Sequence, residues 1–220
     1  MSVGMFGIRM KTKASSYLSF LSDNIEELRA SSTPLWHPLG FVSCIIKQDK
    51  DHTIRVHLWP ESERRVKNPD WPIHTHAYYL SSYVLEGSIR DVRYETIENG
   101  DYVAYAVRYF KGGSEISQTK GRVGVKAVID ESRAEGESYE VAINVFHQSS
   151  VPVDRSAITL VALSNFSDSP PLVLGSLAAD KYPYDRTPYD KNVFWQRVSD
   201  AIEKTLNKSK HSHGVNAAGV

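Results

Sequence analysis

The feature that most constrains the fold of this chain is a series of short segments in which apolar and polar residues alternate. Between residues 41 and 165, roughly nine such segments follow one another, and turn residues separate them at intervals of about 8–12 residues. This texture is typical of an all-β sandwich or barrel. The predicted strands are Phe41 to Lys47, Thr53 to Trp59, a stretch around His74, Tyr83 to Leu85, Ile89 to Ile97, Tyr102 to Phe110, Gly121 to Ile129, Tyr139 to Phe146 and Ala157 to Asn165.

Segments whose apolar residues have helical spacing precede and follow the predicted strands. Apolar residues recur every three or four positions from Ala14 to Arg29 and from Val193 to Leu206. The first stretch predicts one amphipathic helix, or two short ones broken near Ser22–Asp23. We therefore expect one domain with four parts: a helical lead-in at 1–40, a β-barrel at 41–175, a surface wrap and C-terminal helix at 176–207, and a disordered tail at 208–220.

The composition excludes several classes of function. Twenty-six basic and 26 acidic residues cancel, so the charge gives no argument for a nucleic-acid or membrane partner. The lone cysteine, Cys44, rules out an intrachain disulfide and a cysteine zinc cluster. With no apolar leader or membrane-length run, these features favour a cytoplasmic protein.

The chemistry centres on His74 and His76. In a strand, alternate side chains share a face, so these two imidazoles would point the same way. Two neutral imidazoles are half of a transition-metal site. With eight histidines in 220 residues, chance alone gives roughly 0.3 such pairs, so the pair needs a partner from elsewhere in the chain. His147, directly after the predicted strand Tyr139 to Phe146, is the candidate third ligand.

The stretch from His74 to Gly87 resembles the first cupin motif, G-x5-H-x-H-x(3,4)-E-x6-G. The spacing from His76 to Gly87 fits, but Leu80 stands where the motif has a carboxylate, and the first glycine is absent. Glu86 is the alternative carboxylate, although it directly precedes the turn at Gly87. The resemblance therefore implies a metal site with histidine ligands and no glutamate at its usual place.

The stretch from Gly136 to His147 is similar to the second cupin motif, G-x5-P-x-G-x2-H-x3-N. Ala142 replaces the proline, and Asn144 replaces the second glycine. Asparagine tolerates the left-handed backbone conformation better than most residues, so this departure is mild. Val151 replaces the final asparagine. The resemblance, with the strands around the two motifs, covers about residues 54–165, half of the chain.

The resemblance implies a cupin-type jelly-roll β-barrel whose metal is held by His74, His76 and His147. Among cupins, a three-histidine site is similar to that of the thiol dioxygenases, typified by cysteine dioxygenase, which hold ferrous iron. This favours an Fe(II) oxygenase or dioxygenase acting on a small molecule. Two alternatives stay open: a non-redox isomerase, lyase or hydrolase that uses Zn, Ni or Mn as a Lewis acid, and a ligand-binding module without catalysis.

Further site residues are expected among the strand tyrosines, arginines and histidines. Each has an ordinary interpretation as well, because strand tyrosines often only pack, and strand arginines often face solvent. The candidate catalytic residues are Tyr78, Tyr105 and Arg93, and the candidate substrate-binding residues are Arg55, His57 and Tyr83.

A second His-x-His pair, His211 and His213, lies in a polar stretch without the alternation of a strand. We do not expect it to provide a preformed metal site. The expected partner is a small-molecule substrate, with no nucleic acid and no membrane. An exposed edge strand and two terminal helices would also allow a homodimer.

Overall fold

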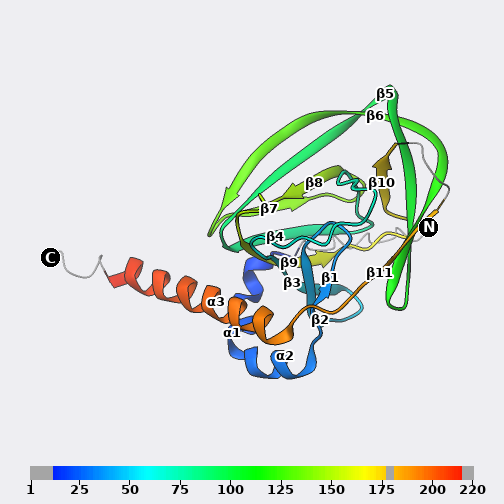
Figure 1. Cartoon of the computed structure of the whole chain (residues 1–220). Coiled ribbons are helices and arrows are strands. Elements are labelled where there is room, and N and C mark those ends of the chain that lie inside the picture. The colour runs from blue at the N-terminus through cyan, green and yellow to red at the C-terminus, as the bar shows by residue number, and fades with distance from the viewer. Residues whose placement is uncertain (1–11, 177–180, 215–220) are drawn as a thin grey trace, which may run out of the picture.

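Two antiparallel β-sheets make up the body of the molecule, and the helices gather on one side of it (Figure 1). The computed structural model describes residues 12–176 and 181–214. The first sheet has the strand order β1-β2-β3-β9-β4-β7. Its strands are β1 (Leu35–Trp36), β2 (Val42–Gln48), β3 (His52–Trp59), β4 (Tyr79–Glu86), β7 (Ser138–Val141) and β9 (Ala157–Ser164).

The second sheet has the order β10-β5-β6-β11, and β8 pairs with β5 beside it. Its strands are β5 (Ser88–Phe110), β6 (Gly113–Ala134), β8 (Phe146–Ser150), β10 (Leu172–Gly175) and β11 (Lys181–Asp185). The predicted all-β barrel with flanking helices is therefore confirmed. The barrel also recruits strands from outside 41–175, because β1 precedes this range and β11 follows it. The stretch expected to be a plain surface wrap thus contributes a strand.

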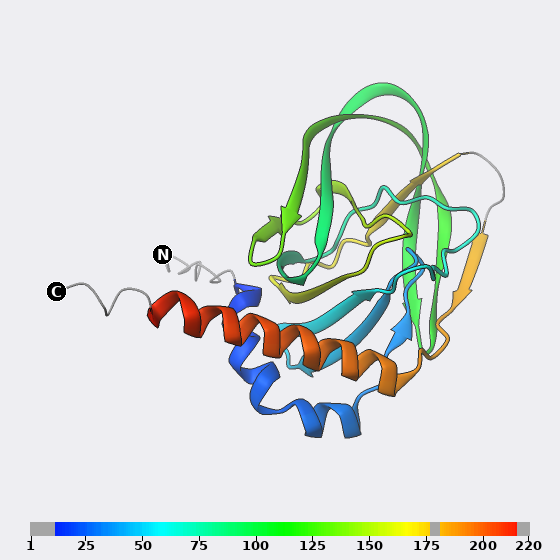
Figure 2. The same cartoon turned by 60° about the vertical axis from the view of Figure 1, so that its left-hand side comes forward.

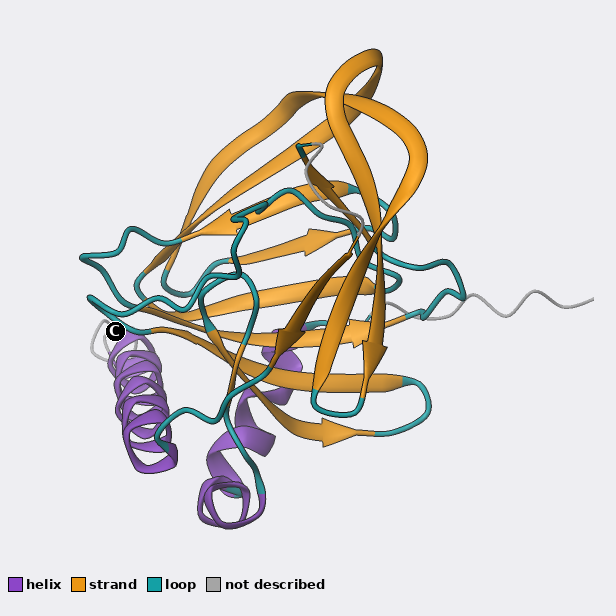
Figure 3. Cartoon of the chain, turned by 45° about the vertical axis from the view of Figure 1, so that its right-hand side comes forward, coloured by secondary structure: helices purple, strands orange, loops and turns teal. Residues whose placement is uncertain are grey.

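Four helical segments pack against the outer face of the six-stranded sheet (Figures 2 and 3). They are the 3-10 turn η1 (Ala14–Tyr17), α1 (Leu18–Asp23), α2 (Ile25–Ser31) and α3 (Lys191–Gly214). The expected break in the first helix lies at Asn24. There the backbone N–H and the side-chain amide of Asn24 both donate to the Phe20 carbonyl, at 3.2 and 2.8 Å, and close α1.

Strand alternation decides which side chains reach the barrel interior. In β3, Ile54, Val56 and Leu58 pack with the helices on the outer face. The intervening residues, Arg55 and His57, therefore point to the inside of the barrel. Arg55, on this inner face, lines the same cavity as two of the candidate metal ligands, His74 and His76.

The helix α3 differs from its predicted extent. It continues to Gly214, so residues 208–214 are helical where a disordered tail was expected, and residues 215–220 lie outside the described residues. Lys204 and Lys208 both pair with Glu135, at 3.0 and 2.7 Å, in the turn between β6 and β7. These two ion pairs tie the later turns of α3 to the barrel. No helix in the described part of the chain is long and apolar enough to span a membrane.

The hairpin of β5 and β6 is a second difference from the sequence-based expectation. The turn predicted at residues 98–101 is absent, and β5 runs through it, with a register shift between Ile97 and Tyr102. Two glycines face each other at this shift: a Cβ on Gly100 would lie 1.9 Å from the Gly124 Cα. The reversal occurs instead at residues 111–112, where a turn was also predicted.

The glycine pair gives a stability prediction. Gly100→Ala places a methyl group against the backbone of β6, which must shift, so we expect the free energy of unfolding to fall by roughly 1–3 kcal/mol. Gly121→Ala is the matched control, because nothing lies within 4 Å of a Cβ at that position. Urea denaturation of both variants measures the difference. Equal midpoints would contradict the close approach of the two strands.

Candidate metal centre

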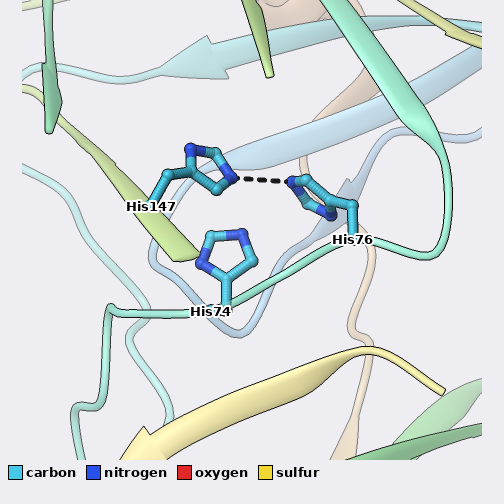
Figure 4. A group of neighbouring side chains, drawn as sticks. All are labelled: His74, His76 and His147. Carbon is cyan, nitrogen blue, oxygen red and sulfur yellow. Dashed lines mark hydrogen bonds between the residues drawn. The ribbon is translucent and has the colours of Figure 1, made fainter. Parts of the chain in front are cut away.

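The three predicted ligands come together. One ring nitrogen from each of His74, His76 and His147 lies within 4.8 Å of the other two. Figure 4 shows the three imidazoles converging on one point from two parts of the chain. The Nε2 atoms of His76 and His147 are 2.9 Å apart. These residues form a group that could hold a divalent metal ion.

Backbone pairing positions these side chains. His147 lies in β8, and His74 lies in an extended segment before β4 rather than in a regular strand. The backbones of these two residues exchange hydrogen bonds of 3.0 and 2.9 Å. Asn144 has a φ of 61° and donates its N–H to the His76 carbonyl at 3.0 Å. The left-handed conformation expected at Asn144 is therefore present, and it bends the chain between β7 and β8 toward His76.

The donor set fits a transition metal. Imidazole nitrogens bind such ions at about 2.0–2.1 Å, so two of them bound at a right angle are about 3 Å apart. The 2.9 Å separation of His76 and His147 matches that value. The Nδ1 of His74 lies 2.8 Å from the Pro72 carbonyl, which can only accept a hydrogen bond. The proton of His74 therefore sits on Nδ1, which leaves its Nε2 lone pair free for a metal.

Burial keeps the three histidines neutral. Desolvation is the largest cause that lowers the pKa of each ring. His74 lowers the pKa values of His76 and His147 further by charge repulsion. Only a neutral imidazole offers a lone pair to a metal. All three rings are therefore neutral at neutral pH, as metal binding requires.

No carboxylate joins these ligands in the described part of the chain. Leu80, at the position where the cupin motif has glutamate, is 6% exposed and packs in the barrel core with Val161 and Leu163. Glu86 forms an ion pair with Arg197 of α3 at 2.9 Å, so its carboxylate binds the helix and not the histidine cluster. The structure thus agrees with a three-histidine site.

A cavity of about 810 Å³ opens beside His74 and His76. Its wall is rich in aromatic rings, and its charged residues are three cations and one aspartate. The aromatic residues are Trp71, Tyr78, Tyr109, Phe110 and Phe166, and the charged ones are Arg55, Lys67, Arg186 and Asp168. This space could admit a small organic molecule to the histidines.

Two of the other predicted site residues line this cavity. Tyr78 stacks on the His76 ring, with centroids 4.7 Å apart, and Arg55 reaches the cavity from β3. His57 also lies on the inner face of β3, where its ring centroid is 4.6 Å from that of Phe41.

Tyr105 and Arg93 do not line the cavity. Tyr105 is fully buried, donates to the Ser176 carbonyl at 2.9 Å, and stacks on Trp71, so it supports the cavity wall. Arg93 lies opposite His147 in the β5–β8 pair, and its guanidinium is held by Asp91 at 2.7 Å.

Tyr83 packs on the outer face of β4 against the helices, away from the cavity. The structure therefore gives no support to Tyr83 as a substrate-binding residue. The reason is the parity of the strand: Leu80 points inward, so Tyr83, three residues later, points outward. His211 and His213 fall in α3 and not in a strand.

Sequence reasoning missed three basic residues of the cavity. His37, Lys67 and Arg186 line it, and all three lie in connecting segments or at their ends. His37 stacks on Phe41 with ring centroids 4.3 Å apart. Their segments have no periodicity that could have revealed which way the side chains point.

No family model matches this chain, and no curated protein matches its sequence. Solved structures do show similarity. An RmlC-like cupin from Shewanella frigidimarina is 14% identical, with a TM-score of 0.36, over 60% of this chain and 83% of that one. A cupin-2 domain from Rhodospirillum rubrum is 13% identical, with a TM-score of 0.34, over 79% and 80% of the two chains.

A third similar structure is hydroquinone 1,2-dioxygenase in complex with Cd²⁺ and 4-hydroxybenzonitrile. It is 14% identical, with a TM-score of 0.37, over 75% of this chain and 83% of that one. These similar structures include cupins. At these scores the likeness carries no argument.

Proposed function

We propose that this protein is a metal-dependent enzyme of the cupin type that acts on a small organic molecule, most simply as an Fe(II) oxygenase. The observation that carries the proposal is the meeting of His74, His76 and His147, with their ligand atoms within 4.8 Å of one another, beside a cavity of about 810 Å³. Three neutral ligands would leave a bound divalent ion its full charge and open positions.

Iron at this position would supply redox chemistry, and Zn, Ni or Mn would supply Lewis-acid chemistry. The chain itself would hold and orient the substrate. The aromatic wall would exclude water, and the Tyr78 hydroxyl, on a ring stacked against His76, could donate a hydrogen bond to the substrate. Arg93, fixed by Asp91 next to His147, would act as a positioning residue and not as a substrate contact.

The metal content of the tag-free protein tests the proposal. We expect about one iron per chain by elemental analysis, and its loss in His147→Ala, because two ligands cannot hold the ion as tightly as three. His52→Ala is the matched control, since His52 lies at the start of β3 beside Asp49 and not in the cluster.

The other outcomes separate the alternatives. Zinc, nickel or manganese in place of iron would favour the non-redox isomerase, lyase or hydrolase. Protein that binds no metal, and that is unaffected by His147→Ala, would contradict the proposal and favour a ligand-binding module. The homodimer and the cytoplasmic location stay predictions.

A further inference from the structure

Two arginines face the cavity without an acidic partner. Arg55 lies in the middle of β3, on its inner face, and Arg186 directly follows β11. Among the described residues, no Asp or Glu pairs with either guanidinium, and the Nε of Arg55 is buried without a hydrogen-bond partner. Both residues are half-buried, and a guanidinium group that is drawn partly out of water usually has a partner. A missing partner at both residues is consistent with a ligand that supplies the negative charge.

The two guanidinium groups affect each other. Burial lowers the pKa of Arg186, and the charge of Arg55 lowers it further. Two like charges that share a cavity destabilise the ligand-free protein. Such an arrangement is typical of a binding site, where groups that bind a ligand lower the stability of the ligand-free protein.

Both arginines are held by rigid surroundings. Arg55 lies on a strand that pairs with β2 at Ile45 and with β9 at Val161. The backbone N–H of Arg186 donates to the Gly112 carbonyl at 3.0 Å, which ties it to the turn of the β5–β6 hairpin. A guanidinium group is a planar fork of donors that binds carboxylates and phosphates through two hydrogen bonds.

The rest of the cavity is suited to an apolar body. The Trp71 ring lines it and is fixed by stacking on Tyr105, with centroids 4.8 Å apart. Phe110 and Phe166 add two more rings to the wall. A ligand that fills this space would place its apolar part against these rings and its charged end between the arginines.

We infer that Arg55 and Arg186 form an oxyanion clamp, and that the substrate is an organic anion, a carboxylate or a phosphonate or phosphate, carried on an aromatic or similarly apolar body. The inference names the substrate class of the site in the proposed function and rests on that function for the reaction. His74 and His76 border the same cavity, so the clamped molecule would lie beside the metal ligands.

Calorimetric titration of the metal-free full chain tests the clamp. The probes are phenylacetate, phenylphosphonate and the uncharged phenylacetamide. We expect one or both anions to bind, and Arg55→Gln and Arg186→Gln each to weaken that binding at least about tenfold, because a charged hydrogen-bond pair is lost. The anion that binds more tightly identifies the oxyanion. Arg108→Gln is the matched control, since its side chain is 78% exposed and pairs with Glu115.

The metal-free protein keeps this test separate from that of the proposed function. Iron content in Arg55→Gln and Arg186→Gln should equal that of the parent, whereas His147→Ala should lose iron and retain anion binding. Anion affinity that neither arginine variant changes would overturn the clamp. Phenylacetamide that binds as tightly as phenylacetate would overturn it as well.

Thermal unfolding distinguishes a binding role from a structural one. Because Arg55 and Arg186 repel each other, Arg186→Gln should raise the Tm of the ligand-free protein while it weakens anion binding. An Arg186 that only holds the fold together would give a lower Tm on substitution, and this result would count against the clamp. Arg186 follows a strand at the sheet edge, so its variant tests the clamp even where Arg55→Gln fails to fold.

Discussion

Leu80→Glu should lower the free energy of unfolding of the metal-free protein by roughly 3–5 kcal/mol at pH 7. The change places a carboxylate at a position that is 6% exposed and packed against Val161 and Leu163. Burial opposes ionisation, so the pKa of the new carboxyl group should rise. The loss of stability should therefore shrink as the pH falls and the group becomes neutral. Urea denaturation between pH 5 and pH 8 measures both effects.

Leu80→Met is the matched control, because it keeps the volume and polarity of the side chain and should cost less than about 1.5 kcal/mol. Added divalent metal should restore part of the stability of Leu80→Glu, since a bound cation pairs with the carboxylate and binds only the folded state. A Leu80→Glu variant as stable as Leu80→Met without metal would contradict the buried position of Leu80.

The stability of the protein should fall below pH 6.5, and His57 should contribute to the loss. Burial, followed by the charges of Arg55 and Arg186, lowers the pKa of His57 to about 3. In the unfolded chain its pKa returns to about 6.5. Between these two values the unfolded state binds the proton and the folded state does not, so folding is penalised by up to about 1.4 kcal/mol per pH unit.

The comparison of His57→Phe with the parent isolates this contribution. We expect the denaturation midpoint of the parent to fall more steeply from pH 6.5 to pH 4 than that of the variant, and the two curves to run parallel above pH 7. His52→Phe is the control, because His52 lies at the surface end of β3 beside Asp49. Parallel curves for His57→Phe and the parent over the whole range would show that folding does not lower the pKa of His57.

Local patterns predicted the elements well where burial and turn chemistry agreed. The alternation in β3 predicted a strand whose two faces differ, and the helices cover one of them. Asn144 predicted a left-handed turn before His147, and its φ is 61°. The prediction of a turn at residues 98–101 was wrong. Gly100 packs there against Gly124 across the hairpin, and only the pairing of β5 with β6 creates this contact.

The sequence by itself predicted the all-β fold class from strand alternation, and the resemblance to the two cupin motifs predicted the three candidate metal ligands. Both predictions use only the order and type of residues along the chain. Only the tertiary structure decided which other groups share the cavity with them. Arg55 and Arg186 are far apart in the chain and meet only when the two sheets close, since no local pattern carries the direction of a side chain across a barrel.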